Sequence, residues 1–386
     1  MRGEERVSPT LSRMVMKLQM VDVVGQYVKI KPDIDNAIHR VLDSGNFIQG
    51  KEVGEFECQV AEYLGMRYAA GCASGTDALQ IAMMALGIGQ GDEVITTPFT
   101  FVATAETIAI LGARPVYVDI DPRTFNLSPS LVEKAITSRT RAIIPVHLYG
   151  QPADMDAIMD IARRNGLKVI EDAAQAMGAS YKAKKVCTFG DIGCISFFPS
   201  KNLGCFGDGG MMVTGDEELW KRMKMIASHG SKERYYHEVL GVNSRLDTIQ
   251  AAILSVKLRH LEEYNSQRQV AASRYDNLLK GAPVVTPSID PKCQHIFHQY
   301  TLRAPQRDAL ATFLKEKGIP HAVYYPVPLH LQKAYASSGN RKGDFPVTEK
   351  AAEEVLSLPM HTELTEEQQS YITGAIQEFY RDHRNA

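Results

Sequence analysis

The chain has 386 residues, of which 44% are hydrophobic and 23% are charged, and its formal net charge is −2. These values are typical of a folded protein with a sizeable core, and they exclude a strongly basic surface for nucleic acid or membrane headgroups. No apolar run reaches the ~20 residues that span a bilayer, and the six cysteines form no Cys-x-x-Cys pair. We therefore expect a cytoplasmic protein with no metal site, no nucleic-acid partner and no membrane association.

Helical and extended patterns alternate along the first two-thirds of the chain. Apolar residues three or four positions apart predict helices, and short apolar runs next to Gly or Pro predict strands. The expected helices are 32–42, 53–64, 79–86, 100–111, 128–136, 153–164 and 219–227, and the expected strands are 68–72, 93–97, 115–118, 142–148, 168–172 and 192–198. This alternation predicts an α/β protein with a mostly parallel sheet, covered on both faces, that binds ligands beyond the carboxyl ends of its strands.

The last third of the chain predicts a smaller α/β domain. A long helical stretch over 247–279 leads into it, and Gly and Pro mark the transition. The expected elements that follow are strands 300–303 and 322–325 and helices 308–317, 347–356 and 366–380. We expect a loosely attached extension over 1–17, a large domain over 18–265 and a small C-terminal domain over 266–386.

Lys201 stands at the end of an apolar run that predicts a buried strand. The run over 192–198 ends at Pro199, and glycines follow the lysine at 204, 207, 209 and 210. Most lysines lie in solvent, so a surface position is the simplest interpretation. However, a lysine at the end of a buried strand loses hydration, and this loss favours the neutral form of its amine. A neutral amine can attack an aldehyde. We therefore interpret Lys201 as a Schiff-base lysine.

A second informative stretch lies between a predicted strand and a predicted helix. Ala73-Ser74-Gly75-Thr76 supplies hydroxyl groups and free backbone N–H groups at a helix start, where the helix dipole favours a phosphate. An ordinary helix cap by Ser74 or Thr76 would need no ligand. Both interpretations stay open for this stretch taken alone.

A carboxylate ends the strand predicted over 168–172, and an amide follows it. Asp172 could hold a pyridinium nitrogen protonated, or it could cap the next helix. Gln175 could reach a phenolic oxygen of the same ligand, and Phe99 or Phe101 could cover its ring. Core packing is the alternative role for either phenylalanine. In chain order, a phosphate loop, an aromatic cover, an acidic strand end and a lysine after a strand form a selective combination.

Five motifs in this order resemble the pyridoxal-phosphate sugar aminotransferases of the DegT/StrS type, from about residue 18 onwards. The motifs are Ala-Ser74-Gly75-Thr76-Asp-Ala-Leu, Pro98-Phe-Thr-Phe101-Val-Ala-Thr, Glu171-Asp172-Ala-Ala-Gln175, Ser196-Phe-Phe-Pro-Ser-Lys201-Asn-Leu-Gly and Gly241-Val-Asn243-Ser-Arg245-Leu-Asp247. The resemblance implies fold type I, the aspartate-aminotransferase-like fold, with pyridoxal phosphate as cofactor. It also implies a homodimer with shared active sites.

The resemblance also implies roles for individual residues. Lys201 would hold the cofactor as a Schiff base, and Asp172 would contact the pyridine nitrogen. Gln175 would lie near the phenolic oxygen, and Phe101 would stack on the ring. Gly75, Thr76 and Ser196 would bind the phosphate, joined by Asn243 from the partner subunit.

Within the family, the segments 99–107, 243–248 and 324–329 look most like those of one subgroup. Its members use L-glutamate to aminate C3 of UDP-2-acetamido-2-deoxy-3-oxo-D-glucuronate, a reaction of cell-surface polysaccharide biosynthesis. By this similarity Arg245 would engage a carboxylate, and His229 and Tyr325 would line the sugar site. Tyr324 is a departure, because a histidine is expected there in that subgroup.

Three other functions stay open from the sequence. The acceptor could be another dTDP- or UDP-linked 3- or 4-keto sugar. A sugar dehydratase of related fold resembles the chain less, because such enzymes replace the Schiff-base lysine with histidine. A regulator could bind the cofactor or a sugar without turnover, although the presence of both Lys201 and Asp172 argues against it.

Overall fold

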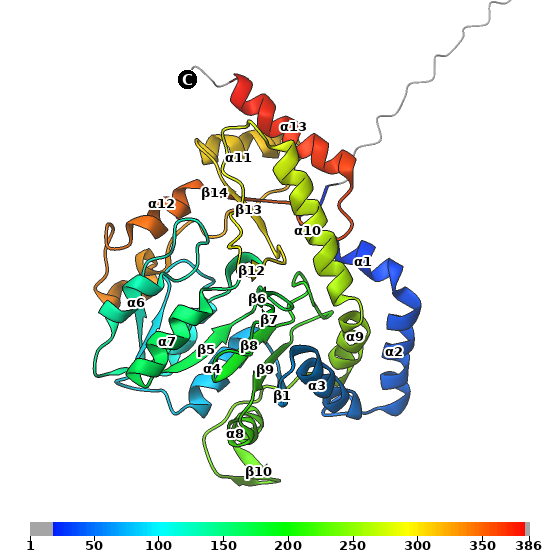
Figure 1. The fold of residues 1–386 in the computed structure, drawn as a ribbon. Helices are drawn as coiled ribbons and strands as arrows, with labels where there is room; N and C mark the ends of the chain where they lie inside the picture. The colour runs from blue at the N-terminus through cyan, green and yellow to red at the C-terminus, as the bar shows by residue number, and fades with distance from the viewer. Residues whose placement is uncertain (1–17, 383–386) are drawn as a thin grey trace, which may run out of the picture.

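The computed structural model describes residues 18–382, so the predicted extension over 1–17 lies outside the described residues. A seven-stranded sheet with the order β1-β9-β8-β5-β4-β2-β3 forms its centre (Figure 1). Its strands in chain order are β1 (Tyr68–Cys72), β2 (Glu93–Thr96), β3 (Arg114–Tyr117), β4 (Thr140–Ile143), β5 (Lys168–Asp172), β8 (Ile192–Ser196) and β9 (Gly210–Thr214). All neighbouring strands are parallel except the two pairs made by β9, which runs antiparallel to β1 and β8.

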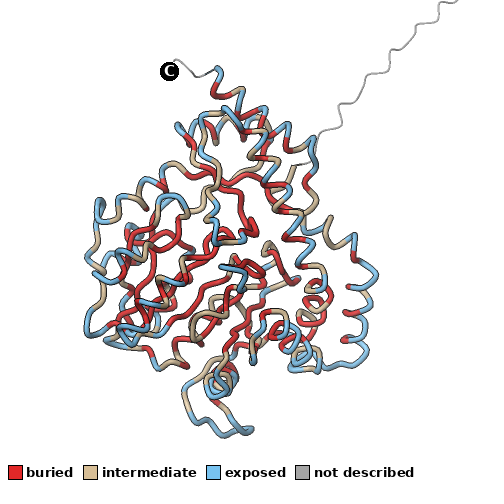
Figure 2. The backbone as a smooth tube through the Cα atoms, viewed as in Figure 1, coloured by how far each residue is buried: buried red, intermediate tan, exposed pale blue. Residues whose placement is uncertain are grey.

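Helices cover both faces of this sheet. Because side chains alternate along a strand, Met211 and Val213 of β9 pack with α3 and α9, whereas Met212 packs with α4 and α8. The strands are therefore buried on both sides, and Figure 2 shows the buried residues, in red, gathered along them. The helices of this part are α1 (Val23–Lys29), α2 (Lys31–Ser44), α3 (Lys51–Leu64), α4 (Gly75–Ala85), α5 (Ala103–Ile110), α6 (Pro129–Ala135), α7 (Met155–Asn165), α8 (Glu217–Ala227) and α9 (Thr248–Leu258).

A smaller α/β unit follows the sheet. The long helix α10 leads into it, and two antiparallel strands, β13 and β14, form its centre (Figure 1). Its core contains large buried side chains from several of these elements, among them Tyr275, Tyr300 and Phe379. Its elements are α10 (Leu261–Leu278), β13 (Tyr300–Arg303), α11 (Arg307–Glu316), α12 (Pro346–Glu354), β14 (Val355–Leu358) and α13 (Glu366–Asp382). The predicted domain boundary at 265/266 falls inside α10 and stays a prediction.

Short strands complete the chain outside the two main sheets. β12 pairs with β6, which pairs with β7, and β10 pairs with β11. Their bounds are β6 (Ser180–Tyr181), β7 (Lys184–Lys185), β10 (Ser231–Glu233), β11 (Tyr236–His237) and β12 (Cys293–Gln294). No helix within residues 18–382 is both long and apolar enough to cross a membrane.

Several predicted elements differ from the structure. The strand expected over 142–148 ends at Ile143 in β4, and the helix expected from residue 79 begins at Gly75 in α4. The helix expected over 247–279 is two helices, because α9 packs on the sheet while α10 turns toward the core of the smaller unit. The strand expected over 322–325 is absent. Ala322 forms a single bridge to Ser357, and Tyr324 and Tyr325 line a cavity instead. The helix expected over 347–356 ends earlier because its last residues pair with β13.

Candidate active site

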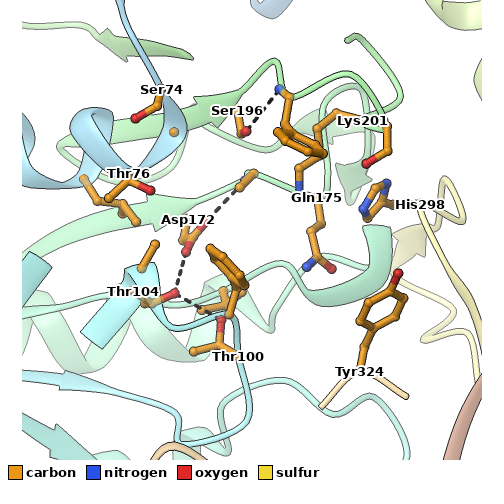
Figure 3. A pocket seen from close by; sticks show the side chains of 18 of the residues that line it. Ser74, Thr76, Thr100, Thr104, Asp172, Gln175, Ser196, Lys201, His298 and Tyr324 are labelled. Carbon is orange, nitrogen blue, oxygen red and sulfur yellow. Dashed lines mark hydrogen bonds between the residues drawn. The ribbon is translucent and has the colours of Figure 1, made fainter. Parts of the chain in front are cut away.

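A cavity of about 590 Å³ lies at the carboxyl ends of the central strands (Figure 3). Loops after β2, β5 and β8, the start of α4 and a segment near residue 298 contribute its walls. Because parallel strands point the same way, residues far apart in the sequence meet at this edge. Eight residues predicted for the site line this one cavity: Gly75, Thr76, Phe101, Asp172, Gln175, Ser196, Lys201 and Tyr325.

Lys201 projects into the cavity from the bend that follows β8. Its backbone N–H donates to the carbonyl of Phe198 (2.8 Å), which fixes the turn. Gly204 closes this bend against the same segment, and a Cβ there would lie 2.4 Å from the carbonyl oxygen of Pro199. Water reaches part of the Lys201 side chain, but protein surrounds its amine and the lost hydration lowers the pKa of Lys201 to about 8. About a tenth of this amine is therefore neutral and nucleophilic at pH ~7, far more than for a lysine with the ordinary pKa of 10.5.

Asp172 lies at the end of β5, on the opposite side of the cavity from His298 in the view of Figure 3. Its carboxylate accepts hydrogen bonds from the hydroxyl of Thr104 (2.8 Å) and the backbone N–H of Ala174 (3.1 Å). Burial raises the pKa of Asp172, while these two bonds and the charge of Lys201 act in the opposite direction. These hydrogen bonds offset the loss of hydration only in part, so the buried carboxylate favours a cationic partner. A protonated pyridine nitrogen would supply one.

The start of α4 forms the other end of the cavity. Ser74 caps the helix, since its hydroxyl accepts from the N–H of Asp77 (3.1 Å), so the predicted cap is present. Within residues 18–382 no hydrogen bond engages the N–H groups of Gly75 and Thr76. A Cβ on Gly75 would lie 2.6 Å from the Cβ of Ser196, so only glycine brings these two segments together. Free N–H groups and hydroxyls at a helix start fit a phosphate.

Gln175 has one fixed orientation. Its Oε1 accepts from the backbone N–H of Tyr149 (2.8 Å), and its Nε2 donates to the hydroxyl of Tyr325 (3.0 Å). The second hydrogen on Nε2 is therefore available to a phenolic oxygen in the cavity. Phe101 lines the same cavity with 56% of its surface exposed, whereas Phe99 is fully buried in the core. Of the two phenylalanines, only Phe101 can cover a ring there.

Three other residues predicted for the site lie away from the cavity of this chain. His229 and Asn243 are exposed, and Asn243 forms a bridge with Ser228. Arg245 lines a separate hollow of about 250 Å³ beside Glu57. The predicted roles of His229, Asn243 and Arg245 stay predictions, and for Asn243 the prediction already places it at the site of the partner subunit.

Sequence reasoning missed several residues of the cavity. Thr104 and Thr100 extend the network of Asp172, because their hydroxyls lie 3.0 Å apart and Thr104 reaches the carboxylate. Their spacing by four residues was a usable signal, since it places both on one side of a helical turn. His298 comes from a segment with no motif of its own, so no local signal could have found it.

Glu171 points to the opposite face from Asp172 and explains the acidic pair at the end of β5. It accepts from the N–H groups of Cys187 (2.8 Å), Phe189 (2.7 Å) and Gly190 (2.8 Å), and from His147 at 3.1 Å. These hydrogen bonds hold the loop over residues 187–190, which precedes β8, against the end of β5. Glu171 therefore has a structural role, and of these two acidic residues only Asp172 faces the cavity.

Comparison with known proteins agrees with this geometry. The model of the DegT/DnrJ/EryC1/StrS aminotransferase family matches residues 28–377. The chain is 55% identical to a "Pleiotropic regulatory protein" of Geobacillus stearothermophilus, covering 95% of this chain and 99% of the relative. It is 54% identical to the UDP-2-acetamido-2-deoxy-3-oxo-D-glucuronate aminotransferase of Pseudomonas aeruginosa, covering 89% and 95%. The crystal structure of DesV from S. venezuelae, in complex with a ketimine intermediate, superposes with a TM-score of 0.92 at 44% identity, covering 94% and 98%.

The fold and the cavity define a pyridoxal-phosphate-dependent aminotransferase of fold type I. The chain belongs to the DegT/DnrJ/EryC1/StrS aminotransferase family. Other structural relatives have been solved in PLP and PMP forms, and the free N–H groups, Asp172 and Lys201 fit that cofactor. The predicted family, fold class, enzyme class and cofactor are therefore confirmed.

Proposed function

We propose that this enzyme transfers the amino group of L-glutamate to C3 of UDP-2-acetamido-2-deoxy-3-oxo-D-glucuronate. The observation that carries amino transfer is that Lys201 and Asp172 face one cavity whose far end is the start of α4. The 54% identity to the Pseudomonas aeruginosa enzyme supports this acceptor. The acceptor class is a keto sugar linked to a nucleotide, and the proposed donor is L-glutamate.

The residues of the cavity divide the chemistry among them. Pyridoxal phosphate, when bound, supplies a carbonyl that takes up the donor amine and a ring that withdraws electrons from it. The N–H groups of Gly75 and Thr76 would hold its phosphate, and Asp172 would hold the proton on its ring nitrogen. Gln175 would donate to its phenolic oxygen.

Lys201 is the residue that moves protons. Its lowered pKa leaves about a tenth of the amine neutral at pH ~7, and this neutral form can accept the proton from the α-carbon of glutamate. The same lysine would pass that proton to the cofactor before 2-oxoglutarate is released, and it would act in the reverse sense at C3 of the keto sugar. Phe101 at the mouth and Tyr325 deeper in the wall would limit how the two substrates enter.

We propose a homodimer in which Asn243 reaches the phosphate of the partner's cofactor, and Arg245 and His229 contact the sugar. All three lie away from the cavity of their own chain, and His229 and Asn243 are exposed, which supports this arrangement. Arg245 has no ion-pair partner within residues 18–382, so its guanidinium is free to bind a carboxylate.

The test is a complete turnover with isotopically labelled nitrogen. Purified enzyme would receive amino-labelled L-glutamate and the keto sugar, and mass spectrometry would detect labelled 3-amino sugar. Lys201→Ala should abolish the product, whereas Lys134→Ala, which changes an exposed lysine on α6, should not. Labelled product from a dTDP- or 4-keto acceptor, but not from this one, would refute the proposed substrate and leave amino transfer intact.

A second candidate function is regulation without catalysis. The name of the Geobacillus stearothermophilus relative, at 55% identity, is the observation that favours it. A regulator that only binds the cofactor has no need for a lysine with a lowered pKa opposite a buried carboxylate. The turnover experiment separates the two candidates, because a regulator would form no labelled sugar.

A further inference from the structure

Behind the cavity, a network of side-chain amides fixes the orientation of one histidine. Nδ2 of Asn202 donates to Oδ1 of Asn265 (2.7 Å) and to the carbonyl of Ile296 (3.2 Å). A carbonyl can only accept, so Oδ1 of Asn202 must be the atom that faces His298, at 3.3 Å from its Nδ1. Nδ1 of His298 therefore carries the ring hydrogen, and the lone pair of the neutral ring is on Nε2.

The surroundings keep this imidazole neutral. His298 is 4% exposed, and its own carbonyl accepts from the guanidinium of Arg268, a buried cation on α10 (3.3 Å). Burial lowers the pKa of His298 well below its ordinary value, and the charges of Lys201 and Arg268 lower it further. Two carboxylates, Asp172 and Asp208, also line the cavity, and Asp172 lies beyond Lys201 in the view of Figure 3.

His298 and Lys201 line the same cavity, and both have an unused hydrogen-bonding atom. Within residues 18–382, neither Nε2 of His298 nor Nζ of Lys201 has a hydrogen-bond partner. Figure 3 shows the imidazole beside Lys201, on the side away from Asp172. An acceptor and a donor that face one cavity can meet when the flexible lysine side chain turns.

We propose that His298 is a positioning residue for Lys201, whose amine donates a hydrogen bond to Nε2 whenever the lysine is released from the cofactor. Asn202 and Asn265 act through His298 by holding its lone pair toward the cavity. A neutral acceptor orients the amine without the strong preference for an ammonium that a second carboxylate would impose. The inference rests on the proposed function, because only a catalytic lysine needs such a resting position.

The first test compares two amide replacements of His298. His298→Asn keeps a donor near the position of Nδ1 but has no atom at Nε2, whereas His298→Gln can place its amide oxygen near Nε2. With equal cofactor content, the rate of the half-reaction with L-glutamate should fall about 10- to 100-fold in His298→Asn. His298→Gln should recover most of that loss. Equal rates in the two variants would indicate a packing role and overturn the proposal.

The second test leaves His298 unchanged and needs no catalysis. Nitrogen NMR of the histidine rings in the cofactor-free protein should show that Nε2 of His298 is unprotonated and hydrogen-bonded. Lys201→Met should shift this resonance toward an unbonded nitrogen, whereas Lys134→Met should leave it unchanged. A resonance unaffected by Lys201→Met, or a proton on Nε2, would overturn the proposal. Absence of any half-reaction in the unchanged enzyme would instead refute the proposed function.

Discussion

The hydroxyl of Thr104 supports the Asp172 carboxylate, and its removal gives the most specific test of the cofactor site. Thr104→Val keeps the shape of the side chain but removes the 2.8 Å bond to Oδ2. Thr104 is 1% exposed and Asp172 is 5% exposed, so water cannot easily replace the lost donor. A hydrogen bond to a charged group contributes about 1.5–3 kcal/mol, which corresponds to roughly 10- to 150-fold in an equilibrium constant.

Loss of this bond raises the pKa of Asp172 further, because Thr104 opposes the effect of burial. The carboxylate then holds a pyridinium less well. We expect the dissociation constant of pyridoxal phosphate to rise by about 10- to 100-fold in Thr104→Val. Absorbance titration of cofactor-free protein with pyridoxal phosphate measures this constant directly.

Thr107 provides the matched control for this experiment. It lies on the same helix, is fully buried, and donates to the carbonyl of Ala103 (2.8 Å) rather than to Asp172. Thr107→Val should lower stability by about 1 kcal/mol and leave cofactor affinity within a few-fold of the unchanged enzyme. Equal cofactor affinities in Thr104→Val and Thr107→Val would refute the reasoning about Asp172.

Three further predictions concern the same cavity. Burial raises the pKa of Asp172 above 3.8 in the folded protein, so the cofactor-free protein should gain stability as the pH falls through that raised pKa toward 3.8. Thermal melts should show that Asp172→Asn abolishes this gain and raises the thermal midpoint at pH ~7. The same variant should have no turnover in the aminotransferase assay. In cofactor-free protein, the labelling of Lys201 by an amine-reactive reagent should have its pH midpoint near the pKa of about 8, and a midpoint near the ordinary 10.5 would contradict the desolvation argument. Gly75→Ala should weaken cofactor binding at least about 10-fold because its Cβ meets Ser196, and Ser196→Gly in the same chain should recover part of the loss; unchanged affinity in Gly75→Ala would show that the phosphate binds elsewhere.

Local sequence patterns predicted the strands that carry the chemistry. The apolar runs that precede Asp172 and Lys201 form buried strands, and their carboxyl ends meet because parallel strands share one direction. The same rule predicts from the sequence alone that Lys201, Asp172 and the start of α4 lie at one edge of the sheet. The helix at the phosphate end begins at Gly75, earlier than the apolar pattern suggested, because its first turn consists of small and polar residues.

The parts that could not be predicted depend on long-range packing. His298 reaches the cavity because the amides of Asn202 and Asn265 hold its segment, and no local pattern encodes that contact. The strand expected over 322–325 has suitable residues, but Tyr325 instead lines the cavity, and its hydroxyl accepts a hydrogen bond from Gln175. No strand was predicted over residues 210–214, where the antiparallel β9 forms, because this short run directly follows the glycine-rich bend after Lys201.

The absorbance spectrum of the cofactor-loaded enzyme tests the central role of Lys201 most directly. The lysine-bound cofactor should give a long-wavelength band that disappears when L-glutamate is added and returns when a keto-sugar acceptor follows. Lys201→Ala should lack this cycle, while Lys134→Ala should retain it. A band in the unchanged enzyme that L-glutamate does not alter, or a full cycle in Lys201→Ala, would contradict the assignment of Lys201 as the catalytic residue.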